Sequence, residues 1–237
     1  MSSFLIMAGG YWRWWGGILA VTAVSLLLFL NWLPQNRVYQ AEAGLGSEAA
    51  CIGDVTLAVI GDFGDAGQPE ADVANLVHSW NVDYVLTTGD NNYPSGAAST
   101  IDANIGQYYQ QYIGSYTGSY GPGAAQNRFF PVPGNHDWNS TNLQPYLDYF
   151  SLPGNERYYA IELGPVHLFT LDSDSREPDG RTATSTQAAW LQNALATSSA
   201  PWKLVTLHHP PYSSSSTHGS DPTMQWPFAA WGATAVL

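Results

Sequence analysis

Two apolar runs rich in β-branched residues, each ending in Gly-Asp, constrain the fold of this chain most. They are DVTLAVIGD at residues 54–62 and VDYVLTTGD at residues 82–90. Between them, PEADVANLVHSW at residues 69–80 places apolar side chains at helical spacing behind a proline and acidic residues. A strand, a helix and a second strand in close succession predict a parallel strand pair with a helical crossover, and therefore an α/β fold.

The remainder of the domain continues this alternation. Runs rich in aromatic and β-branched residues predict strands, and amphipathic stretches behind Thr or Ser predict helices. The further elements expected are a helix over 101–113, a strand over 128–134, two strands over 157–174 that turn at Gly164–Pro165, a helix over 184–196, a strand over 202–209 and the start of a strand over 234–237.

The N-terminus carries a separate apolar segment. Residues 14–33 contain no charged side chain, and as a helix they would span roughly 30 Å, about one hydrocarbon core. Arg13 precedes them, as in a secretory signal or an uncleaved anchor. We therefore expect an exported protein, secreted or periplasmic, or membrane-anchored with its domain outside the cytoplasm. The chain then divides into a signal or anchor segment 1–33, a linker 34–53 and the functional domain 54–237.

The charge balance excludes one class of partner. The chain has 19 acidic against 7 basic residues, a formal net charge of −12. Such a surface repels a phosphate backbone, so no nucleic-acid partner is expected. A phosphorylated small molecule would need local positive charge, which metal ions can supply. Cys51 is the only cysteine, so no intrachain disulfide can form.

Residues with metal-binding side chains follow four of the expected strands. They are Asp62; Asp90 with Tyr93; Asn135 with His136; and His208 with His209. Ligands of open α/β sheets gather beyond the carboxyl ends of the strands, so these ends can converge on one site. A set of Asp, Asn, His and Tyr without cysteine suits iron, manganese or zinc. Strand alternation turns His209 away from His208, so His209 is not expected to be a ligand.

These motifs resemble those of the purple acid phosphatases within the calcineurin-like metallophosphoesterases. The family pattern is Asp-x-Gly, Gly-Asp-x-x-Tyr, Gly-Asn-His-Asp/Glu, Val-x-x-His and a final Gly-His-x-His. The chain matches the first four with DFG at 62–64, GDNNY at 89–93, GNHD at 134–137 and VTLH at 205–208. Tyr93 discriminates best, because most relatives in the wider superfamily lack this tyrosine. The short spacing and the STHGS after VTLH resemble the small, tartrate-resistant type.

The resemblance implies a fold and a metal centre. The fold is an α/β sandwich of two mixed sheets face to face, flanked by helices. The cofactor is a pair of metal ions, Fe(III) and a divalent Fe, Zn or Mn ion. Carried over residue by residue, the roles are ferric-ion ligands Asp62 and Tyr93, bridging ligand Asp90, divalent-ion ligands Asn135 and His208, phosphate contact His136, and substrate positioning or leaving-group protonation by His218.

The activity that the resemblance implies is that of an acid phosphatase. A metal-bound hydroxide would attack a phosphate monoester directly, and a tyrosinate on Fe(III) would give a visible charge-transfer band. Two alternatives stay open: a phosphodiesterase or nucleotidase on the same scaffold, and a non-catalytic exported domain without a complete metal site. The family's Gly-His-x-His should follow soon after Leu237, where the printed sequence ends. We therefore expect a C-terminally incomplete domain in which each metal ion is one histidine short.

The remaining titratable residues are assigned supporting roles. His78 lies on a predicted helix and His167 in a predicted strand, where structural histidines are commoner than ligands. Turn formation or support of the ligands is expected of Asp65, Asp137, Asp172 and Asp174. Neither the natural substrate nor the oligomeric state follows from the sequence.

Overall fold

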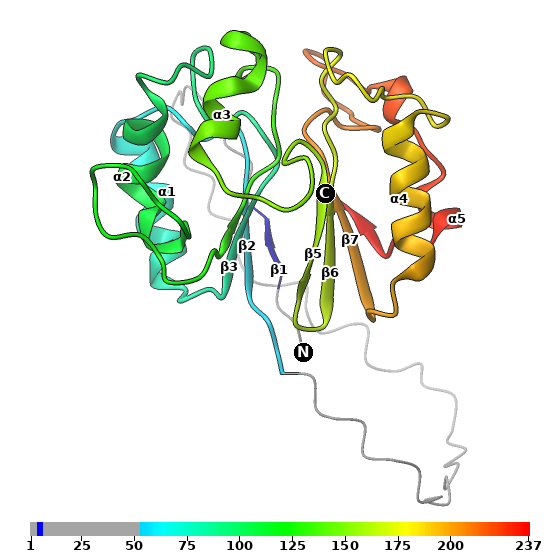
Figure 1. Cartoon of the computed structure of the whole chain (residues 1–237), viewed down its shortest axis with the longest axis horizontal. Coiled ribbons are helices and arrows are strands. Elements are labelled where there is room, and N and C mark those ends of the chain that lie inside the picture. The colour runs from blue at the N-terminus through cyan, green and yellow to red at the C-terminus, as the bar shows by residue number, and fades with distance from the viewer. Residues whose placement is uncertain (1–3, 7–52) are drawn as a thin grey trace, which may run out of the picture. The chain divides into compact units, whose positions relative to one another are not determined.

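Two sheets pack face to face, and helices cover their outer sides (Figure 1). The computed structural model describes residues 4–6 and 53–237. In Figure 1, α1, α2 and α3 lie outside one sheet, and α4 and α5 lie outside the other. This layered arrangement confirms the α/β sandwich expected from the sequence.

The first sheet is parallel in all its described strands. Its strands, in spatial order, are β1 (Phe4–Ile6), β2 (Leu57–Ile60), β3 (Tyr84–Thr87) and β4 (Phe129–Phe130). α1 (Gln68–Ser79) connects β2 to β3, which confirms the predicted parallel pair with a helical crossover. No strand was expected at β1, which falls within the predicted segment 1–33 and pairs with β2.

The helices of this first half follow the sequence pattern with local irregularities. α1 begins after Gly67 with a proline in its first turn, and it buries Ala74 and Val77 against the sheet. The helix expected over 101–113 is a π-helical turn followed by α2 and a 3₁₀ turn. Their bounds, with those of the next helix, are Asp102–Gly106, α2 (Gln107–Tyr109), Gln110–Tyr112 and α3 (Gln144–Tyr149).

The second sheet is mixed. Its strands, in spatial order, are β5 (Tyr159–Leu163), β6 (Val166–Thr170), β7 (Trp202–Thr206) and β8 (Ala235–Val236). β5 and β6 form the predicted antiparallel hairpin, and Gly164 takes φ +60° at its turn. The later strands run parallel to β6. α4 (Thr186–Thr197) begins where Ser185 accepts a hydrogen bond from the Ala188 amide, and α5 (Phe228–Trp231) precedes β8.

Three apolar clusters hold these layers together. The cluster between the two sheets joins residues of both, including Leu57, Leu86, Phe130, Tyr159, Leu168 and Leu204. A second packs the first sheet against α1–α3, and a third packs the second sheet against α4 and α5. Burial of apolar surface on both faces of each sheet fixes the register of the strands and thus the height at which their carboxyl ends lie.

The N-terminal predictions lie outside the described residues. These include the apolar segment 14–33, Cys51 and almost all of the linker 34–53. Among the residues that the structure describes, no helix is long and apolar enough to cross a membrane. Export and the division at residues 33 and 53 stay predictions of the sequence.

One carboxyl group is buried in the core of the first half. Glu70 of α1 is 4% exposed, and its Oε1 has no hydrogen-bond partner within the described part of the chain. Burial raises the pKa of Glu70 from its ordinary 4.5 to about 8; the Tyr109 hydroxyl works against this shift, and the Asp65 carboxylate adds to it. Glu70 is therefore neutral in the folded protein at pH 7.

Glu70 makes the stability of the domain fall as the pH rises. Between pH 4.5 and 8 the unfolded chain has lost the Glu70 proton while the folded chain keeps it. The free energy of unfolding should therefore decrease with pH in this range, by about 1.4 kcal/mol per pH unit from this group. Glu70→Gln, which is neutral at every pH, should lack this contribution when denaturant unfolding is measured from pH 4.5 to 8.

Glu162→Gln, at an exposed position of β5, controls for the loss of one carboxylate. Parallel stability–pH curves for the wild type and Glu70→Gln would show that the Glu70 carboxyl does not keep its proton on folding.

Candidate metal centre

The carboxyl ends of strands from both sheets meet at one cluster of acceptor atoms. Asp62 follows β2, Asp90 follows β3, and His208 follows β7 of the second sheet. One ligand atom from each of these side chains lies within 4.8 Å of the others. The structure therefore brings together three of the ligands predicted from the sequence.

Both aspartates adopt a left-handed backbone conformation. φ is +53° at Asp62 and +52° at Asp90, a region that Asp tolerates better than most residues but that is uncommon outside glycine. The two loops also bond to each other, because the Asp62 amide donates to the Gly89 carbonyl at 3.1 Å. Backbone strain of this kind tends to persist at functional sites, where the surrounding structure holds it in place.

The motif glycines permit the close approach of neighbouring segments. A Cβ atom on Gly64 would overlap the Asn91 carbonyl, and one on Gly134 would overlap the Asp90 carboxylate. Gly89 has φ +99°, and a Cβ there would lie 2.6 Å from the His208 Nδ1 atom. Larger residues at these positions would push the candidate ligands apart.

The Asp90 carboxylate lies at the middle of the cluster and is 3% exposed. Its Oδ1 accepts a hydrogen bond from the His136 amide at 2.9 Å. Its Oδ2 lies 3.0 Å from the Tyr93 hydroxyl and 3.4 Å from the His208 Nε2. The same Tyr93 hydroxyl lies 3.0 Å from the Oδ1 of Asp62, so the tyrosine joins the two carboxylates.

Two histidines are held by backbone carbonyl groups in the same way. The Nδ1 of His208 bonds the Thr88 carbonyl at 2.9 Å, and the Nδ1 of His136 bonds the Pro94 carbonyl at 2.6 Å. A carbonyl can only accept, so each Nδ1 carries the hydrogen, and in the neutral form of each ring the Nε2 atom carries a lone pair. The Nε2 of His208 faces the Oδ1 of Asn135 at 3.1 Å as well as Asp90. Orientation of a histidine through its second nitrogen is typical of metal ligands.

The cluster contains more acceptors than hydrogens. The facing atoms are carboxylate oxygens, an amide oxygen, an imidazole lone pair and one hydroxyl, from Asp62, Asp90, Asn135, His208 and Tyr93. A hydroxyl has one hydrogen and can donate to only one of its two carboxylate neighbours at a time. Cations placed among these atoms would satisfy the surplus lone pairs, so the residues fit metal ions that prefer oxygen and nitrogen ligands.

The charge of the cluster also acts on its tyrosine. Burial raises the pKa of Tyr93 far above its ordinary value, and the charges of Asp90 and Asp62 raise it further. Without cations, Tyr93 is therefore a neutral phenol. A nearby cation reverses this balance because it favours the phenolate.

A buried network missed by the sequence pattern supports the loop that carries Asp90. Asn91 donates from its backbone amide and its side chain to the Asp137 carboxylate, at 3.1 Å and 2.9 Å. Gly134 donates to the same carboxylate at 2.8 Å. Burial raises the pKa of Asp137 to about 6, although these amide hydrogen bonds act to lower it. Asp137 therefore fits the supporting role expected of it, whereas nothing in the sequence singled out Asn91.

Other predicted residues lie outside the cluster. His209, which was not expected to be a ligand, bonds Ser173 Oγ through its Nδ1 at 2.9 Å. His167 bonds Ser198 Oγ at 2.9 Å, and His78 lies on α1 beside Tyr109. His218 is exposed on a serine-rich loop, where its amide approaches Ser215 Oγ at 3.4 Å. Its predicted role stays a prediction.

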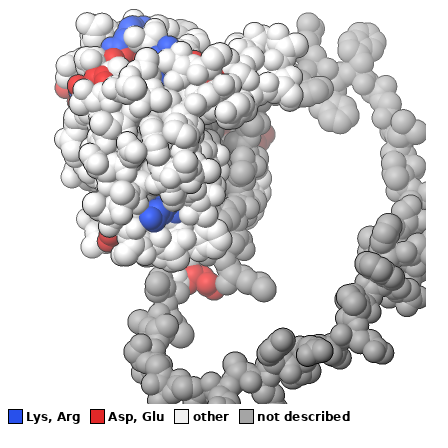
Figure 2. Space-filling view, turned by 90° about the vertical axis from the view of Figure 1, so that its right-hand side faces the viewer, with Lys and Arg blue, Asp and Glu red and all other residues white. Residues whose placement is uncertain are grey.

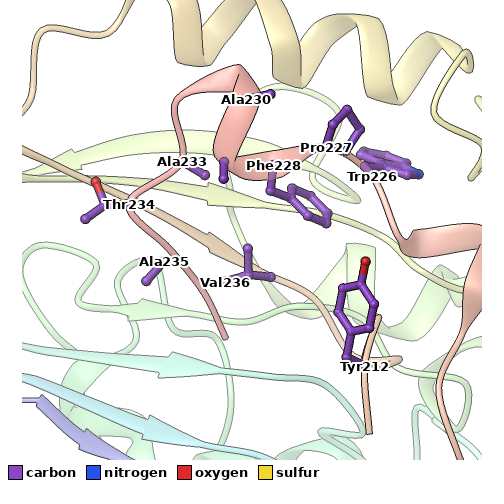
Figure 3. Close-up of a pocket in the computed structure, with 10 residues that line it drawn as sticks. Tyr212, Trp226, Pro227, Phe228, Ala230, Ala233, Thr234, Ala235 and Val236 are labelled. Atoms are coloured by element: carbon purple, nitrogen blue, oxygen red, sulfur yellow. The ribbon is translucent and has the colours of Figure 1, made fainter.

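An apolar pocket lies in another part of the second half (Figure 3). It has a volume of about 550 Å³ and is lined by Tyr212, Trp226, Phe228 and Val236 among others. None of its lining residues is charged. The pocket therefore lacks the groups that would hold a phosphate, and the metal cluster is the better candidate for a catalytic site.

Comparison with known proteins identifies the family. The calcineurin-like phosphoesterase family model matches residues 55–237, and the chain belongs to this family. It is 25% identical over 184 residues to purple acid phosphatase 17 of Arabidopsis thaliana, covering 66% of this chain and 52% of that protein. It is 27% identical over 196 residues to purple acid phosphatase 4 of the same plant, covering 71% and 55%. The chain thus spans about half the length of these relatives.

Solved structures share the fold. A purple acid phosphatase from yellow lupin (Lupinus luteus) seeds superposes with a TM-score of 0.56 at 15% identity, over 74% of this chain and 35% of that one. GAP50, the anchor in the inner membrane complex of Plasmodium, superposes with a TM-score of 0.52 at 15% identity, over 76% and 64%.

Gly89 offers a direct test of the geometry around His208. Gly89→Ala should cost about 1–2 kcal/mol of stability through its positive φ and should also displace the His208 ring. Gly232→Ala is a matched control, because Gly232 has φ +98° and nothing within 4 Å of an added Cβ. Zn²⁺ titration should show weakened binding for Gly89→Ala only. Equal Zn²⁺ affinity in the two variants would contradict the placement of His208 as a ligand.

Proposed function

We propose that the domain hydrolyses phosphate monoesters at a dinuclear metal centre. The observation that carries the proposal is the cluster of converging acceptors around Asp90, which has too few hydrogens to satisfy them. Membership of the phosphoesterase family and the similarity to purple acid phosphatases support the same reading.

The residues divide naturally between two metal positions. We take Asp62 and Tyr93, which are hydrogen-bonded to each other, as one side of Asp90, and Asn135 and His208, which face each other at 3.1 Å, as the other side. We assign Fe(III) to the side with the phenol, because a hard cation suits phenolate and carboxylate oxygens. A divalent Fe, Zn or Mn ion suits the amide oxygen and imidazole of the other side. Asp90 then serves both positions.

Metal ions bound there would neutralise the substrate phosphate, align it, and supply an activated water for in-line attack. Among the residues at this cluster, His136 is assigned the contact with the substrate. Its ring is 34% exposed, and it packs against Tyr93 with centroids 4.5 Å apart. Because the Pro94 carbonyl holds its Nδ1, only Nε2 is free to contact a phosphate oxygen. In its imidazolium form this atom can donate a proton to the departing alcohol.

β8 runs parallel to β7. The Leu207 amide donates to the Leu237 carbonyl at 3.2 Å. Residues that follow Leu237 in a longer chain would therefore run toward the edge that carries His208. A Gly-His-x-His motif at that place would supply the two histidines that the family resemblance calls for.

The proposal is tested on the longest chain that the gene encodes, loaded with iron and zinc. We expect turnover of p-nitrophenyl phosphate well above that of bis(p-nitrophenyl) phosphate, and a visible absorption band. Tyr93→Phe should abolish the band, because the phenolate is its source.

A preference for the diester would replace the proposed function by the phosphodiesterase alternative. Metal uptake without turnover of either ester would favour a non-catalytic domain. A Tyr93→Phe variant that keeps both its colour and its metal content would refute the ferric-site assignment.

A further inference from the structure

Arg176 uses all five of its side-chain N–H donors inside the protein. It lies in the loop after β6, and its side chain is 38% exposed. Nε and Nη2 donate to the Asp174 carboxylate at 2.6 and 2.8 Å. Nη1 donates to the Trp138 carbonyl and to the Asn139 side chain, both at 3.1 Å. Nη2 also donates to the Asn135 carbonyl at 3.0 Å. A guanidinium has five such donors in total. Although Arg176 is partly exposed, it has no donor left for a substrate phosphate.

The three bonds to Asn135, Trp138 and Asn139 connect loops of the two sheets. Arg176 lies in the loop after β6 of the second sheet, whereas the turn 134–139 follows β4 of the first. A second contact between the same segments runs from the Trp138 indole N–H to the Asp172 carboxylate at 2.9 Å. The guanidinium also stacks over the Trp138 ring, with Cζ 5.7 Å from the ring centroid. The loop 172–176 is thus hydrogen-bonded to both ends of the turn that carries Asn135 and His136.

These hydrogen bonds matter because the Asn135 side chain contacts a residue that follows a strand of the opposite sheet. Its Oδ1 lies 3.1 Å from the Nε2 of His208, which follows β7. The first-sheet side of the turn is held by Asp137, through the Gly134 and Asn91 amides. Apart from this Asn135–His208 contact itself, the side-chain hydrogen bonds of the described residues that tie the turn to the second half come from Arg176 and Asp172. Small shifts of a ligand's backbone weaken metal binding, because the residues that bind the metal depend on the groups that orient them.

Two other arginines, Arg157 before β5 and Arg181 after β6, have other partners. Arg157 pairs with Glu177 at 2.9 Å and with Asp179 at 2.9 Å. Arg181 pairs with Asp221 at 2.6 Å. Acidic and basic side chains gather together near the upper end of the face shown in Figure 2, which otherwise carries few charges. Arg176 differs from these two arginines because its bonds reach the turn 134–139.

We propose that Arg176 is a positioning residue that holds Asn135 against His208 and so sets the metal affinity of the position that these two residues form. The inference rests on the proposed function, because it presupposes that Asn135 and His208 bind a metal ion. Arg176 acts through the backbone of the turn and contacts neither substrate nor metal.

The test compares Arg176→Met with Arg157→Met in the full chain. Each substitution removes an arginine that pairs with a carboxylate of the segment 174–179. Only Arg176→Met also breaks the bonds to the turn 134–139. In metal-free protein, hydrogen exchange of the peptide covering 134–139 should accelerate in Arg176→Met and stay at the wild-type rate in Arg157→Met. In a Zn²⁺ titration, Arg176→Met should bind roughly 10- to 100-fold more weakly than Arg157→Met.

Arg176→Lys keeps the charge beside Asp174 but offers three donors for five acceptors, so its Zn²⁺ affinity should fall between those of the wild type and Arg176→Met. It also serves as the test variant if Arg176→Met does not fold. The proposal would be overturned if the Arg176 variants kept the wild-type rate of hydrogen exchange at 134–139 and the wild-type Zn²⁺ affinity. It would also be overturned if Arg157→Met lost as much Zn²⁺ affinity as Arg176→Met. A wild-type chain that takes up no Zn²⁺ would overturn the proposed function itself. The hydrogen-exchange comparison would still show whether Arg176 holds the turn 134–139 in place.

Discussion

The buried carboxylate of Asp90 is the group on which the rest of the centre depends. It is 3% exposed, lies in a left-handed turn, and collects contacts from Tyr93, His136 and His208. A buried carboxylate is costly unless positive charge or donors compensate it. The two histidines turn their Nδ1 hydrogens to backbone carbonyls, so in the neutral form of each ring the Nε2 atom presents Asp90 with a lone pair rather than a donor. Bound cations resolve this conflict, and this is the physical basis for interpreting the site as a metal centre.

The centre is divided between two sheets, so its geometry depends on how they pack. Asp62, Asp90, Tyr93 and Asn135 belong to the first sheet and its loops, whereas His208 belongs to the second. The apolar cluster between the sheets sets their separation. The Thr88 carbonyl then orients the His208 ring, and Arg176 ties the turn of Asn135 to the second sheet. Apolar packing therefore sets the distance between the two sheets, and a few hydrogen bonds set the orientation of the ligands.

The sequence predicted the elements whose signals are local. β-branched runs located the strands around Asp62 and Asp90, and glycines before the polar residues marked the turns that bring them together. The two-sheet arrangement came from the family resemblance. The structure added β1, the π-helical turn at Asp102–Gly106, the buried Asn91 and the contacts of Arg176. These could not be predicted because they depend on which distant groups the fold brings together, and no periodic pattern records such pairings.

The most direct test of this account is the metal content of the longest chain that the gene encodes, measured by elemental analysis for the wild type and Asp90→Asn. The variant keeps the shape of the side chain but removes the charge that both metal positions would share. The account predicts two metal ions per wild-type chain and the loss of both in Asp90→Asn. Retention of both ions by Asp90→Asn, or loss of only one, would contradict a shared role for this carboxylate.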